Sequence, residues 1–393
     1  MKNFFFRLVG ASVILTTVST TLTGQCHDNV DALGRSCRNV IQTAVPFMRI
    51  APDARSGAMG DVGIGTSPDA NAMHFNASKL VFAEQTTGAS VTYTPWLRNL
   101  GVDDIYLADF AGFYQFGEGK RKQAVGVDLR YFSLGKIDWT DENGTRLSEG
   151  TPREFSAAVG YSRQLTDNLA VGLTGKFIYS NLAAGLSIGS QQIASGKAGA
   201  ADVSLTYKTP IQLSDKKTRL MAGLAISNIG SKVTYVKNGD FLPTNLGLGA
   251  AWEIPLDQYN TITIALDVNK LLVPTPDSST GEWRTLGSVA GIFRSFSDSK
   301  SNFGEKMREL YWSTGIEYWY DKQFSVRAGY FYEDKTKGGR QYFTAGLGLK
   351  YNVFGINLSY LVPTTSQRNP LDNTLRFSLL FDLGSFKGET VNE

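Results

Sequence analysis

The sequence predicts an all-β protein, a transmembrane antiparallel β-barrel of about 14 strands. Apolar and polar residues alternate along many segments between residues 86 and 384, the period of a strand with two different faces. The connections between these segments are alternately short and long, as in outer-membrane barrels with short periplasmic turns and longer outer loops. The chain has 41 Gly, 12% aromatic residues and only 12 Pro, a composition that favours strands over disorder.

The first element along the chain is a secretory signal peptide, predicted for residues 1–24. Lys2 and Arg7 give a positive start, LVGASVILTTV is a short apolar core, and STTLTGQ offers small residues for cleavage. The core is about a dozen residues long, which is too short for a membrane-spanning helix. We therefore expect export, with cleavage near Gly24–Gln25.

Two cysteines, Cys26 and Cys37, follow the predicted signal peptide. An exported chain meets an oxidising compartment, which favours a disulfide between them. Two unpaired thiols in a mobile tail are the alternative.

Residues 25–85 are predicted to form a periplasmic N-terminal segment and a hatch inside the lumen. The stretch from 53 to 78, DARSGAMGDVGIGTSPDANAMHFNAS, is dense in small and polar residues and too poor in apolar ones for a domain of its own. A barrel of about 14 strands has a lumen wider than its own wall side chains fill. We expect two short helices, within APDARSGAMG and SPDANAM, with Asp53 or Ser67 capping their starts.

Residues 86–384 are predicted to form the barrel itself, followed by a periplasmic tail at 385–393. In NLAVGLTGKFIYS, Leu173 and Phe177 fall on one face of the strand and Lys176 on the other. Strands are expected to start near residues 86, 102, 122, 153, 168, 199, 218, 244, 259, 309, 323, 340, 353 and 372.

Charged and aromatic residues distinguish the barrel from a soluble β-sandwich, which would also place aromatics on one face. Charges in strand centres suit a polar lumen: Asp128, Lys176, Asp202, Asp267 and Glu317. Aromatic residues lie toward strand ends, where they could form girdles at the two interfaces: Tyr93, Trp96, Tyr106, Tyr131, Trp252, Trp312, Tyr318, Tyr332, Tyr351 and Tyr360.

The predicted hatch resembles that of the FadL-like long-chain fatty-acid transporters. Its two motifs stand here as Ala54, Arg55, Ala58, Met59, Gly60 and Gly63, then Asp69, Ala70 and Asn76-Ala77. That family usually has Pro after the Asn, where this chain has Ala77.

Three longer stretches make the mature chain similar to the PorV family, also called LptO, of the type IX secretion system of Bacteroidetes. They are TAVPFMRIAPDARSGAMGDVGIGTSPDANAMHFNASKL, VTYTPWLRNLGVDDIYLADFAG and GIFRSFSDSKSNFGEKMRELYWSTGIEYWY. The resemblance implies a non-enzymatic shuttle in the Gram-negative outer membrane. It implies that the protein binds the C-terminal β-sandwich domain of secreted cargo. The cargo then passes from the translocon barrel to a sortase complex that joins it to lipopolysaccharide.

The sequence offers little for catalysis, and no catalytic residue, metal site or cofactor is predicted. The two histidines, His27 and His74, lie in the N-terminal tail and the hatch, so no predicted strand supplies the His of a Ser-His-Asp triad. Clustered metal ligands and phosphate-binding loops are not found. A net charge of +3 gives no reason to expect a nucleic acid partner.

The outer loops are the better candidates for partner binding. The longest connection, from Leu271 to Arg308, contains SVAGIFRSF and NFGEKMREL, whose apolar residues recur at helical spacing. Two short amphipathic helices there could dock a partner, or the loop could fold back over its own barrel. The candidate contacts are Trp96, Leu97, Trp139, Phe241, Trp283, Ile292, Phe293 and Phe296.

Two other functions remain open from the sequence. A FadL-like channel for hydrophobic small molecules would use the hatch as a gate. Such a channel would not require an outer loop as elaborate as the longest connection, from Leu271 to Arg308. The PorV resemblance also implies a link to outer-membrane lipid through lipid A deacylation, for which His74 in the hatch is a candidate base, with a packed histidine as the alternative.

Overall fold

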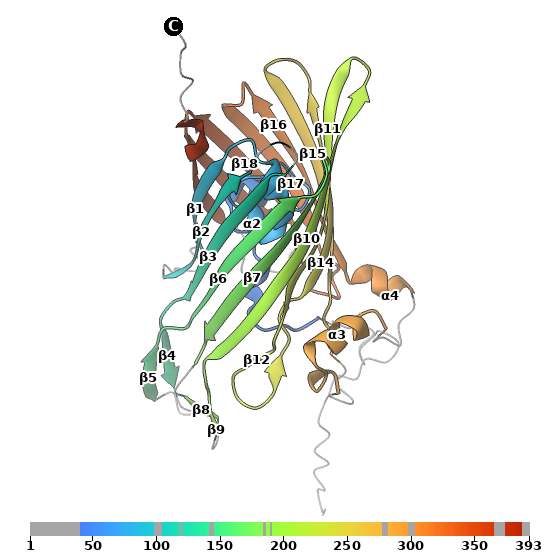
Figure 1. Ribbon diagram of the computed structural model, residues 1–393. Coiled ribbons are helices and arrows are strands. Elements are labelled where there is room, and N and C mark those ends of the chain that lie inside the picture. Colours follow the sequence, from blue (N-terminus) through green and yellow to red (C-terminus); the bar gives the residue numbers. More distant parts are fainter. Residues whose placement is uncertain are drawn as a thin grey trace, which may run out of the picture. The chain divides into compact units, whose positions relative to one another are not determined.

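The computed structural model describes most of the chain (Figure 1). The predicted signal peptide, both cysteines and most of the predicted C-terminal tail lie outside the described residues. These are 40–97, 104–117, 119, 121–140, 145–183, 186–188, 191–276, 282–297, 303–364 and 374–386.

A closed barrel of 14 antiparallel strands dominates the fold, as the sequence predicts (Figure 1). Each strand pairs with the next barrel strand along the chain, and the first pairs with the last to close the sheet. The barrel strands are β1 (Thr87–Pro95), β2 (Ile105–Phe116), β3 (Gln123–Leu134), β6 (Arg153–Gln164), β7 (Leu169–Asn181), β10 (Gly196–Leu213), β11 (Lys216–Gly230), β14 (Asn245–Pro255), β15 (Asn260–Leu271), β16 (Leu310–Tyr320), β17 (Phe324–Tyr332), β18 (Gln341–Tyr351), β19 (Phe354–Pro363) and β20 (Leu375–Asp382).

The predicted alternation sets the two faces of the wall, because successive side chains of a strand point to opposite faces. On β7, Leu173 and Phe177 are exposed on the outside, whereas Lys176 points inward and forms an ion pair with Asp202, 2.7 Å from Nζ to Oδ2. The predicted lumen charges at Asp128, Asp202, Asp267 and Glu317 are all buried. The wall is therefore apolar outside and polar inside.

The connections differ in length at the two ends of the barrel, as predicted. The turn end carries the six short ones, for example residues 352–353, where Asn352 adopts a positive φ of 54° that Asn tolerates better than most residues. The loop end, the lower end in Figure 1, carries three hairpins and the helices of the longest loop. These are β4 (Ile137–Thr140) with β5 (Arg146–Gly150), β8 (Ser187–Ile188) with β9 (Gln191–Gln192), β12 (Val233–Thr234) with β13 (Gly239–Asp240), η4 (Glu282–Arg284), α3 (Ser288–Arg294) and α4 (Phe303–Arg308).

Residues 40–85, here called the lumen segment, run inside the barrel from the loop end to the turn end. At the loop end, the Ala44 N–H donates to the Phe241 carbonyl, 2.8 Å away. Near the turn end, the Gln115 side-chain amide donates to the Val81 carbonyl, also over 2.8 Å. The segment contains η1 (Pro46–Arg49), α1 (Ala54–Ala58), α2 (Ala72–Phe75) and η2 (Ala77–Phe82).

The sequence predicts a periplasmic N-terminal segment ahead of a hatch inside the lumen, but the described start of the lumen segment lies at the other end of the barrel. Residues 41–50 instead lie at the loop end, while β20 and the following η5 (Leu383–Phe386) end at the turn end. The physical reason is apolar burial. Phe47 and Ile50 pack in a cluster with wall residues such as Leu107 and Ile178, and burial of one such side chain stabilises by about 1.5–3 kcal/mol.

A second apolar cluster closes the lumen segment near the turn end, around Leu80, Val81 and Phe113. Polar contacts fill the region between the two clusters and form the first part of the candidate site. Among the described residues, no helix is long and apolar enough to cross a membrane.

Candidate functional site

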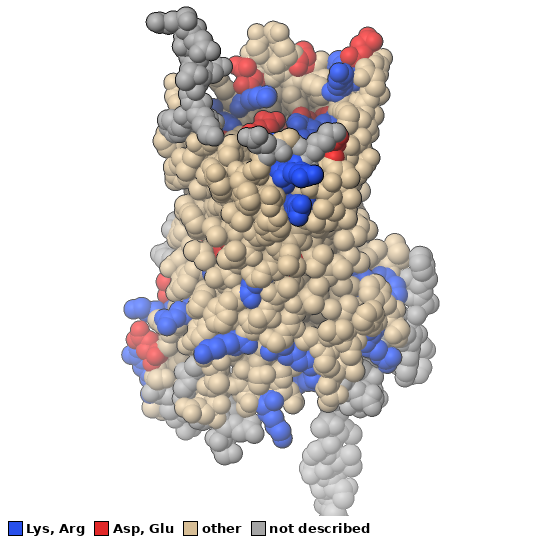
Figure 2. All heavy atoms as spheres, in the orientation of Figure 1, with Lys and Arg blue, Asp and Glu red and all other residues tan. Residues whose placement is uncertain are grey.

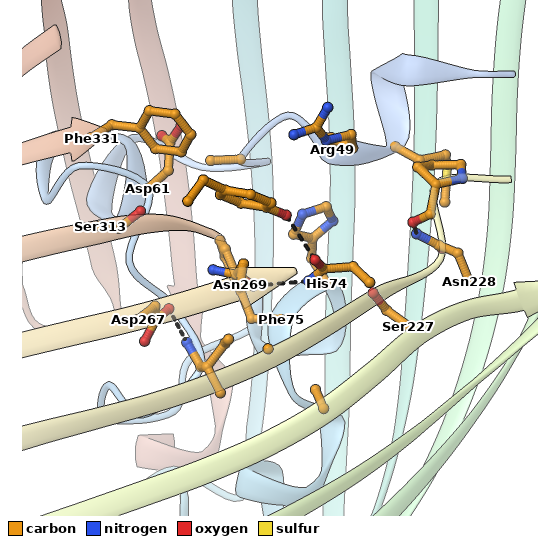
Figure 3. Close-up of a pocket in the computed structure, with 18 of the residues that line it drawn as sticks. Arg49, Asp61, His74, Phe75, Ser227, Asn228, Asp267, Asn269, Ser313 and Phe331 are labelled. Carbon is orange, nitrogen blue, oxygen red and sulfur yellow. Dashed lines mark hydrogen bonds between the residues drawn. The ribbon is translucent and has the colours of Figure 1, made fainter. Parts of the chain in front are cut away.

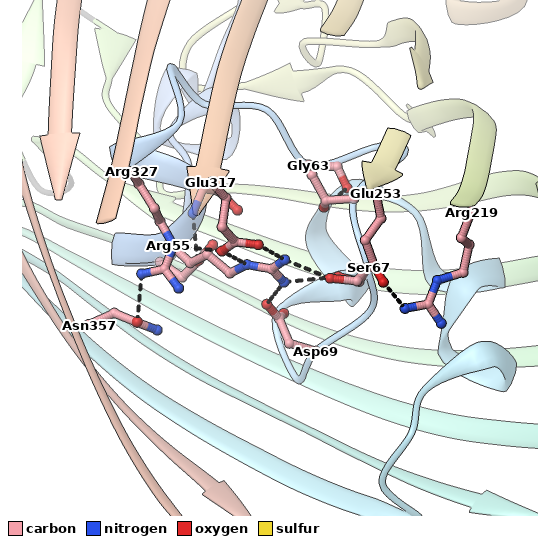
Figure 4. A network of polar contacts seen from close by, with 12 residues as sticks. Arg55, Gly63, Ser67, Asp69, Arg219, Glu253, Glu317, Arg327 and Asn357 are labelled. Carbon is pink, nitrogen blue, oxygen red and sulfur yellow. Dashed lines mark hydrogen bonds and ion pairs between the residues drawn. The ribbon is translucent and has the colours of Figure 1, made fainter. Parts of the chain in front are cut away.

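Arg55 on α1 is the centre of the polar contacts between the lumen segment and the wall (Figure 4). Its Nε and Nη2 donate to the two carboxylate oxygens of Glu317 on β16, over 2.9 and 2.8 Å. Arg55 also donates to Asp69 (3.0 Å) and to the Ser67 hydroxyl (2.6 Å). Arg327 on β17 donates from Nε to the same Glu317, over 2.6 Å. Arg55 thus joins Asp69, another predicted hatch residue, to a carboxylate of the wall.

The electrostatics of this network favour a permanently charged Arg55. Burial acts to lower the pKa of Arg55, but the carboxylates of Glu317 and Asp69 outweigh burial and raise that pKa above its ordinary value. A buried carboxylate shared by two guanidinium groups holds α1 against β16 and β17.

The start of α1 is capped by Asp53, one of the two residues predicted as helix caps. The Asp53 carboxylate accepts from the Ser56 N–H over 2.9 Å, which satisfies a free donor of the first turn. Burial raises the pKa of Asp53. Ser67 is not a cap: it binds Arg55, and α2 begins after Asn71 without a side-chain cap.

Small residues allow the lumen segment to touch the wall backbone. Gly60 has a φ of +72°, and its N–H donates to the Thr344 hydroxyl over 2.9 Å. A Cβ on Gly329 of β17 would lie 2.1 Å from the carbonyl carbon of Met59. The Gly63 N–H donates to the Asp267 carboxylate over 2.7 Å. Gly60 and Gly329 are needed because no side chain fits between the two backbones, and a Cβ on Gly63 would meet the Phe75 ring.

Asn76 connects the second half of the lumen segment to β10. Its side-chain amide donates to the Thr206 hydroxyl (2.9 Å) and to the Ile64 carbonyl (3.0 Å). Its carbonyl oxygen accepts from the Ser78 N–H over 3.2 Å and caps η2, in which Ala77 is the first residue.

Burial lowers the pKa of two basic side chains of the lumen segment. His74 lies beside Arg130, with 3.1 Å between Nδ1 and the guanidinium. Burial first, then Arg130 and Lys176, lower the pKa of His74 well below its ordinary value. Burial lowers the pKa of Lys79 to about 8, and its Nζ donates to Thr66 over 3.1 Å. A neutral His74 whose Nδ1 accepts from Arg130 fits a packing role in the lumen segment.

Two cavities border the lumen segment. One of about 80 Å³ lies on its loop side and is lined by Arg49, His74, Asp267 and other polar residues (Figure 3). The other, of about 210 Å³, lies nearer the turn end, where Arg219 and Lys322 line it. Both cavities carry charged linings. Within the described chain, no group of three or more His, Cys, Asp or Glu is arranged to hold a metal ion.

The longest loop forms the second part of the candidate site, and both predicted helices are present in it as α3 and α4. Phe241 and Trp283 stack with ring centroids 6.5 Å apart and are only 4% and 9% exposed. Gly291 of α3 packs against the Phe241 ring. The prediction of direct partner contacts at Phe241 and Trp283 does not fit this burial, because both rings form the inner core of the loop.

A buried group of charges fixes α4 to the barrel. Glu309 is 5% exposed and contacts Lys270 at the end of β15 and Lys306 on α4, 3.4 Å away. Glu305, one helical turn earlier, accepts from Lys337 over 2.7 Å. The sequence reasoning missed these residues. The i, i+4 spacing of the two carboxylates was the available signal, because it places both on one helix face.

Four apolar side chains of α3, α4 and the turn between them face outward, and together they are here called the loop patch. Val289, Phe293, Phe296 and Met307 are each between 51% and 71% exposed. Ile292, also predicted as a contact, is partly buried beside them. An exposed apolar surface of this kind often marks a site of protein interaction.

The remaining predicted contacts lie elsewhere. Trp96 is partly buried and packs edge-on against Phe132, with centroids 4.9 Å apart. Leu97 follows it with a positive φ of 53°. Trp139 lies on β4, in a different loop. The structure therefore brings together only Ile292, Phe293 and Phe296 of the predicted set on one surface.

Comparisons with known proteins place these features in a family. Residues 34–278 match the family model described as "Type IX secretion system protein PorV". None of the curated proteins matches the chain.

Solved structures of outer-membrane proteins resemble the fold at low sequence identity. The toluene transporter TbuX of Ralstonia pickettii has 13% identity and a TM-score of 0.44, over 84% of this chain and 96% of its own. A FadL homologue of Pseudomonas aeruginosa has 9% identity and a TM-score of 0.43, over 88% of this chain and 100% of its own. At these scores the likeness carries no argument about what this chain does.

The family match covers more than half of the chain, and the closed barrel has an apolar outer face and a polar lumen, as expected of an outer-membrane protein. The chain therefore belongs to the PorV family of type IX secretion system proteins and is an outer-membrane β-barrel.

Proposed function

We propose that this protein receives the C-terminal β-sandwich domain of secreted cargo at the cell surface. It passes the cargo from the translocon barrel to the sortase of the attachment complex and performs no chemistry itself. Membership of a secretion-system family supports this role. The observation that carries it is the loop patch, in which four large apolar side chains are exposed on α3, on α4 and on the turn that follows α3.

The energetics of the loop patch suit the capture of a protein partner. Complete burial of a side chain such as Phe293 contributes about 1.5–3 kcal/mol. The contacts of Glu305 with Lys337 and of Glu309 with Lys270 order α4 in advance. A preordered surface loses less conformational entropy when a partner binds.

The interior of the barrel supports a role at the outer surface. The lumen segment spans the bore, with an apolar cluster around Phe47 at one end and another around Leu80 at the other. A folded cargo domain would have to displace the whole segment in order to enter. We therefore infer that cargo is held on the loops.

Co-purification from outer membranes tests this proposal. Phe293→Ala removes the most exposed ring of the loop patch and should reduce cargo recovery about 30-fold, the effect of losing one 2 kcal/mol hot spot. Tyr259→Ala is the matched control, because this ring is also exposed but lies in a short turn at the opposite end. Absence of cargo from the unaltered protein would contradict the function, and equal recovery from both variants would contradict the loop assignment.

A channel for hydrophobic small molecules is the second candidate, favoured by the cavity of about 210 Å³ near the turn end. Phe82, Met221 and Leu349 give this cavity an apolar part. Uptake of a labelled fatty acid should then depend on the protein. Equal uptake by a deletion strain would end this alternative.

A further inference from the structure

A row of aromatic rings crosses the outside of the barrel toward the loop end. Tyr131 on β3, Phe155 on β6 and Tyr179 on β7 are register partners on adjacent strands. The rings of Phe155 and Tyr179 stack with centroids 5.1 Å apart. Aromatic rows of this kind lie at the boundary between the hydrocarbon core and the lipid head groups.

Two basic residues lie at or beside this row. Lys197 on β10 is the register partner of Tyr179, so it occupies the next position of the row. Arg153 lies two residues beyond Phe155 on the same outward face of β6. Both side chains are exposed, and neither forms an ion pair with any residue that the structure describes.

The neighbouring surface is also basic. Lys and Arg side chains form a band across the lower part of the face seen in Figure 2, with acidic atoms gathered at its left. In the β4–β5 hairpin, Asp138 and Glu149 contact Arg146 at 2.7 Å each. The charges of that hairpin are thus paired, whereas those of Arg153 and Lys197 are available to a ligand.

We propose that Arg153 and Lys197, here called the basic girdle, bind the phosphate-bearing head group of lipopolysaccharide in the outer leaflet. A charged side chain is costly on the lipid face unless it reaches the head groups, and the long stems of Arg and Lys allow this. A guanidinium can hold a phosphate through two parallel hydrogen bonds. The loop end faces the outer leaflet in outer-membrane barrels, and that leaflet supplies phosphorylated saccharides next to the aromatic row.

The test is a binding titration of the purified full-length protein in mild detergent with lipopolysaccharide, with phosphatidylglycerol and inorganic phosphate as separate arms. Each basic side chain near an anionic surface contributes about a fivefold gain in affinity. The double variant Arg153→Gln/Lys197→Gln should therefore bind lipopolysaccharide about 25-fold more weakly. The matched control is Lys216→Gln/Lys217→Gln, which removes the same charge from exposed residues at the turn end and should bind like the unaltered protein.

The outcomes separate the sources of phosphate. Binding of lipopolysaccharide that depends on the basic girdle, with weaker binding of the other two ligands, supports the proposal. Equal binding of phosphatidylglycerol or inorganic phosphate with the same dependence would overturn the assignment to the glycolipid. A change under threefold in the double variant would overturn the site. Heat-modifiable migration on gels verifies folding, and the single variants, expected to lose about fivefold each, replace the double one if it does not fold.

Discussion

Glu317→Gln tests whether the buried network holds the lumen segment in place. The change keeps the size of the side chain and removes its charge, so Arg55 and Arg327 lose the carboxylate that they share. Both partner side chains are largely buried, at 11% and 1% exposed. Breaking a buried pair by removing one partner costs about 3–5 kcal/mol. We expect a loss of this size in the stability of the packed lumen segment.

Hydrogen exchange of the intact barrel in detergent measures this loss. Each 1.36 kcal/mol is a factor of ten, so amide protection over α1 should fall by about 10² to 10⁴. The wall strands should keep their protection, because their backbone hydrogen bonds are unchanged. Glu149→Gln is the control, since this carboxylate is 48% exposed and exposed pairs contribute less than about 1 kcal/mol.

A second variant separates the charge argument from a loss of packing. Arg55 keeps its ion pair with Asp69 in Glu317→Gln, whereas Arg327 loses its only carboxylate partner among the described residues. Glu317→Gln combined with Arg327→Met removes that unpaired cation, so it should recover part of the protection over α1. A fall of less than tenfold in Glu317→Gln would refute the reasoning, as would a double variant less protected than the single one.

Three further predictions concern other contacts of the lumen segment. Because the pKa of His74 in the fold lies below its ordinary 6.5, stability should fall as pH drops below that value; hydrogen exchange at pH 5 and 7.5 should show this, and equal acid sensitivity in His74→Gln would contradict it. Gly329→Ala places a methyl group against the Met59 backbone and should lower the free energy of unfolding in guanidinium by more than about 1–3 kcal/mol. Gly199→Ala is the control, because its methyl group meets open space, and equal unfolding midpoints for the two variants would contradict the prediction. Phe47→Ala should cost about 3–5 kcal/mol locally and speed proteolysis near η1, and unchanged proteolysis would contradict it.

The strands could be predicted closely because one physical constraint acts on every one of them. Each strand needs an apolar outward face toward lipid and a polar inward face, so apolar and polar residues alternate along its sequence. The predicted start near residue 168 in NLAVGLTGKFIYS agrees with the observed start of β7 at Leu169 to one residue. α3 and α4 were predictable for the same reason, since their apolar residues recur at helical spacing.

The path of the lumen segment could not be predicted, because its partners are distant in the chain. Arg55 and Glu317 are 262 positions apart, and no local pattern connects them. Phe47 lies in a short, mostly apolar stretch, PFMRI. This pattern indicates that the Phe47 side chain is buried, but it does not indicate at which end of the barrel. Phe241 and Trp283 illustrate the same limit: aromatic loop residues suit both an interface and the inner core of a loop.

The number of contacts along the lumen segment decides where this protein can act. Removing the segment would break the Arg55–Glu317 pair, strand the Asp267 carboxylate that binds the Gly63 N–H, and open the cluster around Phe47. At about 3–5 kcal/mol for the ion pair alone, complete release would cost a large part of a typical folding free energy of about 5–15 kcal/mol. Turnover of many cargo molecules through the bore would meet this cost each time. The proposed binding of cargo on the loop patch would leave the interior unchanged, so the proposed shuttle would work from its outer surfaces.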